Sequence, residues 1–238
     1  MSLCSGFNYF VMNKRLEKIA SFVRPGRGLV DVGTDHGYLP LWLAEHGYEG
    51  ALFASDIVPK PLASAERNFI EAGFEDRIEL LLCDGLSLCP PEKINTIVVA
   101  GMGGDTICGI LDRAEWCLDE AYTLILQPMT KCEVLRFWLV NNGFYLRREE
   151  YVRDCGTIYQ VIEAGYGKVM SLSDAELYIG AWENVCRDPL LPDILRACKM
   201  RFNAEREGLL RAAVPNRGRL ALCCSILEEI SNRLVEIE

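Results

Sequence analysis

The chain has 238 residues, enough for one α/β domain of typical size and a smaller appendage. Half of the residues are apolar and a quarter are charged, as in globular proteins, and no apolar stretch approaches the roughly 20 residues of a membrane helix. The net charge of −9, taken over the whole chain, argues against a nucleic-acid partner. The first dozen residues lack a basic leader and a sufficient apolar region for secretion, so we expect a cytoplasmic protein.

The cysteine and histidine content speaks against disulfides and metals. Eleven cysteines are scattered through apolar segments such as LLCDGL and LALCCSIL, which favours buried free thiols. There are two histidines and no CxxC pair. We therefore expect no metal site.

Apolar, β-rich runs alternate with segments of helical spacing along the first two thirds of the chain. The runs are Leu29 to Val32, Ala51 to Ser55, Ile78 to Leu82, Thr96 to Ala100 and Tyr122 to Leu126. The expected helices are Asn13 to Val23, Pro40 to His46, Pro59 to Ala72, Gly104 to Asp112 and Lys131 to Asn142. This alternation predicts right-handed βαβ units and a parallel sheet.

Two more strand-like runs, FYLRREEYVRD and TIYQVIEAG, are separated by Cys155 and Gly156 and predict a hairpin. Five parallel strands finished by a hairpin are the outline of the class I, Rossmann-like methyltransferase fold in the α/β class. After a break at 165–167 the pattern is helical, with one helix expected over 173–186. Two long helices follow, joined by VPNRG and expected to pack antiparallel as a coiled coil. We predict a methyltransferase domain over 1–167 and a helical domain over 168–238.

The segment LVDVGTDHGYLP, at 29–40, indicates the type of ligand. An apolar strand ends in an acid, Asp31, and a glycine-bearing turn follows, which suits a nucleotide-like ligand at the C-terminal edge of a parallel sheet. The GxGxxG spacing of dinucleotide folds is absent. Asp31 would repel a pyrophosphate but attract the ammonium and sulfonium of S-adenosylmethionine. This pattern favours a methyl donor over NAD.

Two further acids follow the next strands. Asp56 ends the second strand and can accept hydrogen bonds from both ribose hydroxyls of an adenosine, although it could instead cap the next helix. Asp84 follows the third strand and could accept from the adenine amino group, with Gly85 letting the backbone bend beneath the base. An ordinary Asp-Gly turn is the alternative for this pair.

The run IVVAGMGG, at 97–104, leads a strand into a small-residue loop beside the expected methyl group. It lacks the Asn-Pro-Pro-aromatic sequence of many enzymes that methylate exocyclic amino groups. In the first loop, Asp35 could face the ligand amine or the acceptor base. Its neighbour His36 could contact the ligand, or it could simply pack within the loop.

The blocks that carry a resemblance to a known family are LVDVGTDHGYLP, SDIVPKPLASAERN, CDGL, IVVAGMGG, LILQP, LRFWLVNNGF and IYQVIEAG. The chain resembles the TrmK family over nearly its whole length. That family comprises bacterial tRNA methyltransferases that act on N1 of adenine 22, and the terminal helices resemble its coiled-coil domain. The resemblance implies S-adenosylmethionine as cofactor and tRNA as partner. Asp35 is our catalytic candidate, because its carboxylate could accept from the adenine amino group and offset charge that develops on the ring. The resemblance places five residues in the donor-binding motifs, namely Asp31, Gly33, Asp56, Asp84 and Gly101. Their neighbours His36, Ile57, Gly85, Ala100 and Met102 are further cofactor-binding candidates.

The stretch from Arg187 to Arg219 holds eight basic residues against four acids, a local charge of +4. It could hold tRNA phosphates, or it could be an ordinary solvated helical face. Two rival functions stay open at this point. One is methyl transfer to a small molecule or a protein, and the other is a non-catalytic S-adenosylmethionine-binding protein.

Overall fold

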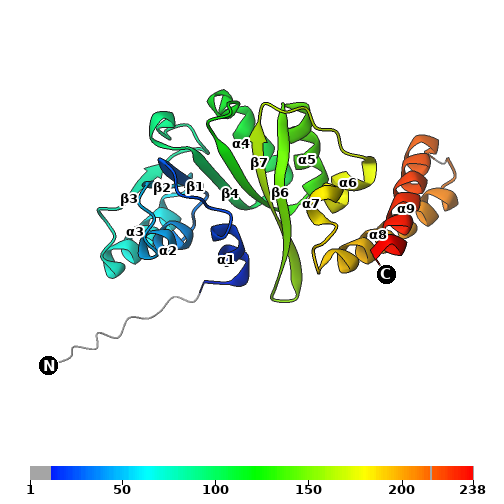
Figure 1. Ribbon diagram of the computed structural model, residues 1–238, viewed down its shortest axis with the longest axis horizontal. Helices are drawn as coiled ribbons and strands as arrows, with labels where there is room; N and C mark the ends of the chain where they lie inside the picture. The colour runs from blue at the N-terminus through cyan, green and yellow to red at the C-terminus, as the bar shows by residue number, and fades with distance from the viewer. Residues whose placement is uncertain (1–11, 215, 238) are drawn as a thin grey trace.

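The computed structural model describes residues 12–214 and 216–237, and within them seven strands form one sheet in the order β3-β2-β1-β4-β5-β7-β6. The strands are β1 Gly28–Val32, β2 Ala51–Asp56, β3 Ile78–Leu82, β4 Thr96–Gly103, β5 Thr123–Thr130, β6 Phe144–Asp154 and β7 Thr157–Tyr166. The first five are parallel, and β7 is antiparallel to both β5 and β6 (Figure 1). The predicted parallel sheet with a terminal hairpin is confirmed.

Helices cover both faces of this sheet. They are α1 Lys14–Ala20, α2 Tyr38–Glu45, α3 Pro59–Ala72, α4 Gly104–Asp112 and α5 Cys132–Asn141, with short 3-10 turns at Pro91–Lys93 and Glu115–Cys117. One buried core joins α1, α2 and α3 to the sheet, and a second joins α4 and α5 to the opposite face. Helix α2 begins two residues earlier than expected, directly after Gly37, which is in the left-handed conformation at φ 70°.

The alternation of side chains along β1 explains which face each residue serves. Leu29 packs in the core beneath α1, α2 and α3, whereas Val30 and Val32 pack in the core beneath α4 and α5. Because successive strand residues point to opposite faces, Asp31 shares the face of Leu29. The acid that ends the first strand is therefore directed toward the side of the sheet that α1 covers.

The C-terminal part consists of α6 Asp174–Ile179, α7 Trp182–Val185, α8 Leu191–Arg211 and α9 Arg217–Ile237. The single helix expected over 173–186 is wrong, because Gly180 adopts φ 87° and ends α6. Ser173 and Glu176 form a capping box at the start of α6, as its sequence suggests.

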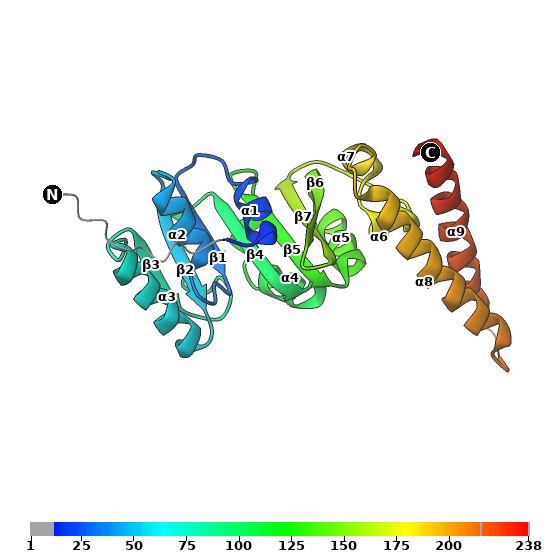
Figure 2. The same cartoon turned by 90° about the horizontal axis from the view of Figure 1, so that it is seen from below.

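The expected pair of long helices is present. Helices α8 and α9 pack together and extend beyond the sheet (Figure 2). Their apolar faces build a third core, which also includes Tyr151 of β6. Pro215, in the expected VPNRG turn, lies outside the described residues. So do residues 1–11, which belong to the N-terminal segment that lacks a basic leader in the sequence.

The cysteines of the described ranges are free thiols. Cys83, Cys89, Cys108, Cys117 and Cys223 are buried. Cys155 and Cys224 are exposed, so the expectation of buried thiols does not extend to every cysteine. Across 12–214 and 216–237, we find no helix long and apolar enough to cross a bilayer. The same ranges contain no cluster of three His, Cys, Asp or Glu side chains able to hold a metal ion.

Candidate functional site

The carboxylate of Asp31 lies buried at the end of β1, with 6% of the residue exposed. Its Oδ2 accepts a hydrogen bond of 2.7 Å from the hydroxyl of Thr34. Burial raises the pKa of Asp31 to about 6, although the Thr34 hydrogen bond and the Arg15 charge lower it, and the Asp56 carboxylate adds to the rise. A buried carboxylate of this kind gains most from a cationic ligand and disfavours a pyrophosphate.

The loop after β1 is held against the neighbouring strands. The backbone amides of Gly33 and Thr34 both donate to the carbonyl of Ser55, at the end of β2. Gly33 has φ 72°, and a Cβ on it would lie 2.1 Å from the terminal methyl of Met102. Glycine is favoured here for its backbone conformation alone, because the Met102 methyl, at the end of a flexible side chain from β4, could move aside.

Asp56 ends β2 next to exposed apolar side chains. Its Oδ1 accepts a hydrogen bond of 2.8 Å from the backbone of Val58. Val58 is itself the N-cap of α3, so Asp56 orders the residue before the helix and does not cap it. Ile57 is 63% exposed, and Leu82, the β3 partner of Asp56, is 53% exposed. A carboxylate flanked by exposed apolar surface suits a ribose and its base.

Asp84 and Gly85 form a turn after β3. The amide of Ser87 donates to the Asp84 carbonyl, and Gly85 has φ 59°. The Asp84 carboxylate is half-exposed and pairs with Arg113 at 3.0 Å. The turn that we gave as the alternative is present, and recognition of adenine by Asp84 stays a prediction.

The small-residue run continues β4 through Gly103, with register shifts against β5 around Met102. Ala100 is the last residue in regular register, and Gly101 follows it with φ 77°. The amide of Gly101 donates to Oε1 of Gln127, which is fully buried in β5. The predicted loop is therefore an irregular strand end, tied to its neighbour by a buried amide side chain.

The loop between β1 and α2 carries Asp35 and His36. Asp35 has φ 54°, a conformation that few residues other than glycine adopt, and its side chain is 71% exposed. The His36 ring stacks on Tyr38 and lies 3.6 Å from the Asp35 carboxylate. Strained residues concentrate at functional sites, which fits the predicted role of Asp35. The cofactor role of His36 also stays a prediction.

Arg15 and Gln127 are residues of this site that sequence reasoning missed. Nη1 of Arg15 donates to Oε1 of Gln127 at 2.6 Å, and its guanidinium lies over the ring of Tyr159 at 5.8 Å. Arg15 comes from α1, which precedes the first strand, and no motif marks it. The LILQP block showed only a strand, because the buried position of Gln127 depends on the register of β4 and β5.

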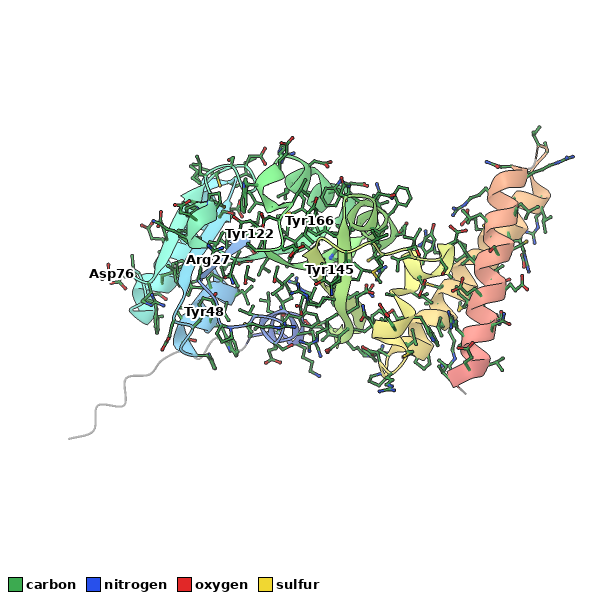
Figure 3. The ribbon with its side chains drawn as sticks, turned by 45° about the horizontal axis from the view of Figure 1, so that its top comes forward. Arg27, Tyr48, Asp76, Tyr122, Tyr145 and Tyr166 are labelled. Carbon is green, nitrogen blue, oxygen red and sulfur yellow. The ribbon has the colours of Figure 1, made fainter. Side chains whose placement is uncertain are left out.

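Arg27, Tyr48, Asp76 and Tyr122 precede β1, β2, β3 and β5, and mark the edge of the sheet where these strands begin (Figure 3). An open depression of about 430 Å³, lined by residues that include Asp76 and Lys93, lies at that edge. The predicted cofactor residues gather at the other edge, where the strands end. There, buried and exposed carboxylates, left-handed glycines and exposed apolar side chains fit a cationic adenosyl ligand.

Comparison with known proteins agrees with this geometry. Residues 12–162 match the family described as "Methyltransferase domain". The tRNA (adenine(22)-N(1))-methyltransferase of Bacillus subtilis is 32% identical over 161 residues, which are 67% of each chain.

Solved structures of related proteins superpose closely. A putative tRNA (m1A22) methyltransferase of Streptococcus pneumoniae, in complex with S-adenosyl-L-methionine, is 29% identical with a TM-score of 0.81, covering 94% of this chain and 100% of that one. The B. subtilis TrmK structure, 24% identical, shares the fold with a TM-score of 0.84, over 94% of this chain and 99% of that one. The chain belongs to the TrmK family of methyltransferases.

Proposed function

We propose that this chain transfers a methyl group from S-adenosylmethionine to N1 of adenine 22 in tRNA. The observation that carries the proposal is the buried carboxylate of Asp31, which lies at the same sheet edge as Asp56 and the exposed Ile57. The proposal is supported by the B. subtilis relative, which is a tRNA (adenine(22)-N(1))-methyltransferase by name. With tRNA as the substrate, we propose that the enzyme works in the cytoplasm.

Each part of the site has a defined task toward the donor. S-adenosylmethionine, when bound, supplies an electrophilic methyl group on a cationic sulfur. Asp31 provides the negative charge that holds the cationic end, and Asp56 accepts from the ribose hydroxyls. Ile57 and Leu82 offer apolar contact to the adenine ring. Gly101, without a side chain, leaves space beside the reacting groups.

The lone pair on N1 of the acceptor adenine would displace the methyl group from the sulfur, and S-adenosylhomocysteine would leave with the electrons of the broken sulfur–methyl bond, so no covalent enzyme intermediate is needed. N1 lies on the pairing edge, and the base must first leave its pair or stack. Holding the two reactants aligned can contribute on the order of 7–11 kcal/mol. The methylated ring becomes positively charged, and the Asp35 carboxylate can accept from its amino group and offset that charge.

We expect Asp35→Asn to lower kcat about tenfold while changing donor affinity by less than about twofold. The reason is that asparagine keeps the acceptor oxygen and tolerates the left-handed backbone, but it loses the charge that strengthens the hydrogen bond by about 1.5 kcal/mol. Single-turnover methylation and calorimetry measure the two effects separately. An unchanged kcat would remove Asp35 from the catalytic site.

The helical C-terminal part is the proposed tRNA-binding domain, with its boundary near residue 167. Much of its positive charge is already paired within the protein. Arg196, Arg201, Arg211 and Arg219 form ion pairs with Asp193, Glu133, Glu207 and Glu205. Lys199 and Arg206 line an open depression of about 330 Å³ between α8 and α9. Because these two cations share one surface depression, we propose them for phosphate contacts.

We expect the double substitution Lys199→Gln and Arg206→Gln to weaken tRNA binding and to reduce the salt dependence of that binding. Each lost phosphate contact lowers the slope of log K against log salt by about 0.7–0.9. Filter binding at several salt concentrations provides the measurement. Lys93→Gln with Arg77→Gln, at the far edge of the sheet, removes the same charge as a control. Equal losses of tRNA affinity in both double variants would mean that only the net charge of the protein matters.

The function itself is tested by incubating unmodified tRNA with labelled S-adenosylmethionine and mapping the modified nucleotide. We expect label at N1 of adenine 22 and none in a tRNA with guanine at that position. Label at another nucleotide would contradict the position, and transfer only to a small molecule or protein would favour the first rival. Donor binding without any transfer would favour a non-catalytic protein.

A further inference from the structure

Arg15 reaches the proposed donor site from a helix outside the parallel βαβ units. Helix α1 packs on β6 and β7 (Figure 1), and Arg15 lies in its first turn. Its guanidinium contacts the ends of three strands. It donates to Gln127 of β5, lies over Tyr159 of β7, and stands 3.7 Å from the position of a Cβ on Gly101 of β4.

Strand alternation brings these groups to one face. Val98, Ile125 and Val161 belong to the core under α1, α2 and α3. Gln127 and Tyr159, two residues from Ile125 and Val161, therefore share that face, as Asp31 does. Arg15 and Asp31 are thus directed into the same region at the C-terminal edge of the sheet.

The two charges influence each other but do not form an ion pair. Arg15 acts electrostatically on Asp31, yet within the described residues neither side chain has an oppositely charged partner inside 4.0 Å. Arg15 has five N–H donors, and one hydrogen bond, to a neutral amide oxygen, is seen. A partly buried guanidinium and a buried carboxylate are therefore directed to the same edge without pairing with each other.

A cation and an anion that are directed to one region without pairing with each other suit a ligand that carries both charges. An α-amino acid head group has an ammonium for the carboxylate and a carboxylate for the guanidinium. Arginine binds carboxylates through paired, charge-assisted hydrogen bonds. The methionyl end of S-adenosylmethionine is such a head group.

We propose that Arg15 binds the methionyl carboxylate of the donor and, with Asp31, selects ligands that carry an intact amino acid head group. This assignment rests on the proposed function, because it places the donor at the ends of β1 and β4. The hydrogen bond to Gln127, which also accepts from the amide of Gly101, fixes the guanidinium relative to the strand end.

The test compares two ligands by calorimetry, S-adenosylmethionine and its decarboxylated form, which keeps the sulfonium and the amine. We expect Arg15→Met to weaken the binding of S-adenosylmethionine at least tenfold, because one charge-assisted hydrogen bond is lost. The affinity for the decarboxylated ligand should change by less than about twofold. Arg15→Lys should recover part of the affinity. Lys14→Met, a neighbouring exposed cation, is the matched control and should change neither ligand.

Other outcomes overturn the assignment. Equal weakening of both ligands by Arg15→Met would mean that Arg15 acts through Gln127 and the strand end. Unchanged affinity for both ligands, with loss of tRNA binding, would assign Arg15 to a tRNA phosphate. If the unaltered protein binds neither ligand, the proposed function itself is contradicted, whatever the Arg15 variants do.

Discussion

Asp31→Asn is expected to weaken S-adenosylmethionine binding about 30- to 100-fold while making the ligand-free protein more stable. The affinity falls because a buried, charge-assisted contact worth about 2–3 kcal/mol is lost. The stability rises because burial lifts the pKa of Asp31 from 3.8 to about 6, so its charged form opposes folding at neutral pH. At about 1.4 kcal/mol per pH unit, that difference amounts to about 3 kcal/mol.

The pH dependence follows from the same shift. A carboxyl whose pKa is raised on folding contributes stability that is complete below 3.8 and is lost as the pH rises through about 6. The stability advantage of Asp31→Asn should therefore be largest above pH 6 and vanish below 3.8. Donor affinity of the unaltered protein should decline below pH 6, as Asp31 gains a proton.

Thermal denaturation and calorimetry at several pH values measure both quantities. Asp76→Asn, at the opposite edge of the sheet, controls for the change in net charge and should alter neither. A loss of stability together with unchanged donor affinity in Asp31→Asn would show that this carboxylate serves the fold and not the cofactor.

Arg136→Met is expected to destabilise the protein by about 3–5 kcal/mol. Arg136 and Glu149 are both fully buried and pair at 2.8 Å. Burial is the largest single influence and lowers the pKa of Arg136, but the Glu149 charge, the hydrogen bond to Glu149 and the nearby Cys132 and Tyr151 together outweigh it, so the pKa is raised. The guanidinium also donates to the carbonyl of Leu177, and Glu149 accepts from the amide of Ala181. The pair thus ties α5 and β6 to the segment around α6 and α7.

Removal of the arginine leaves a buried carboxylate without a cation, which is why the expected loss is large. At about 2–4 °C per kcal/mol, the melting temperature should fall by roughly 10 °C. Arg136→Met with Glu149→Gln should recover much of it, because no charge is then left unpaired. Arg211→Met breaks an exposed pair with Glu207 and should cost less than about 1 kcal/mol. Equal losses in Arg136→Met and Arg211→Met would contradict the role given to burial.

Local patterns were enough to predict the sheet. Buried parallel strands are nearly continuous apolar runs, and Cys155 with Gly156, both at positive φ, forms the short turn that the hairpin needs. The break at Gly180 was missed because a lone glycine inside a helical pattern is often tolerated. Gly180, at φ 87°, ends α6, and the amide of the next residue, Ala181, donates to the buried Glu149, a tertiary interaction that no local pattern encodes.

The candidate site likewise contains residues that local patterns predict and residues that only tertiary packing brings together. Asp31, Gly33 and Asp56 lie at or next to the C-terminal ends of strands, so their convergence at one edge follows from the topology of a parallel sheet. Arg15 and Gln127 are far apart in sequence and meet through the packing of α1 on the hairpin, which no local pattern encodes. The roles of His36, Asp84 and Asp35 depend on bound ligands and stay predictions.

We propose that carboxylates at the ends of β1 and β2 hold a cationic adenosyl cofactor and direct its methyl group toward Gly101. A crystal structure of this chain with S-adenosylmethionine tests it most directly. We predict ribose hydroxyls within hydrogen-bonding distance of Asp56, the amino group beside Asp31, and the methyl group facing the end of β4. A cofactor bound elsewhere, or with its adenine in the place of the methionyl end, would contradict the account.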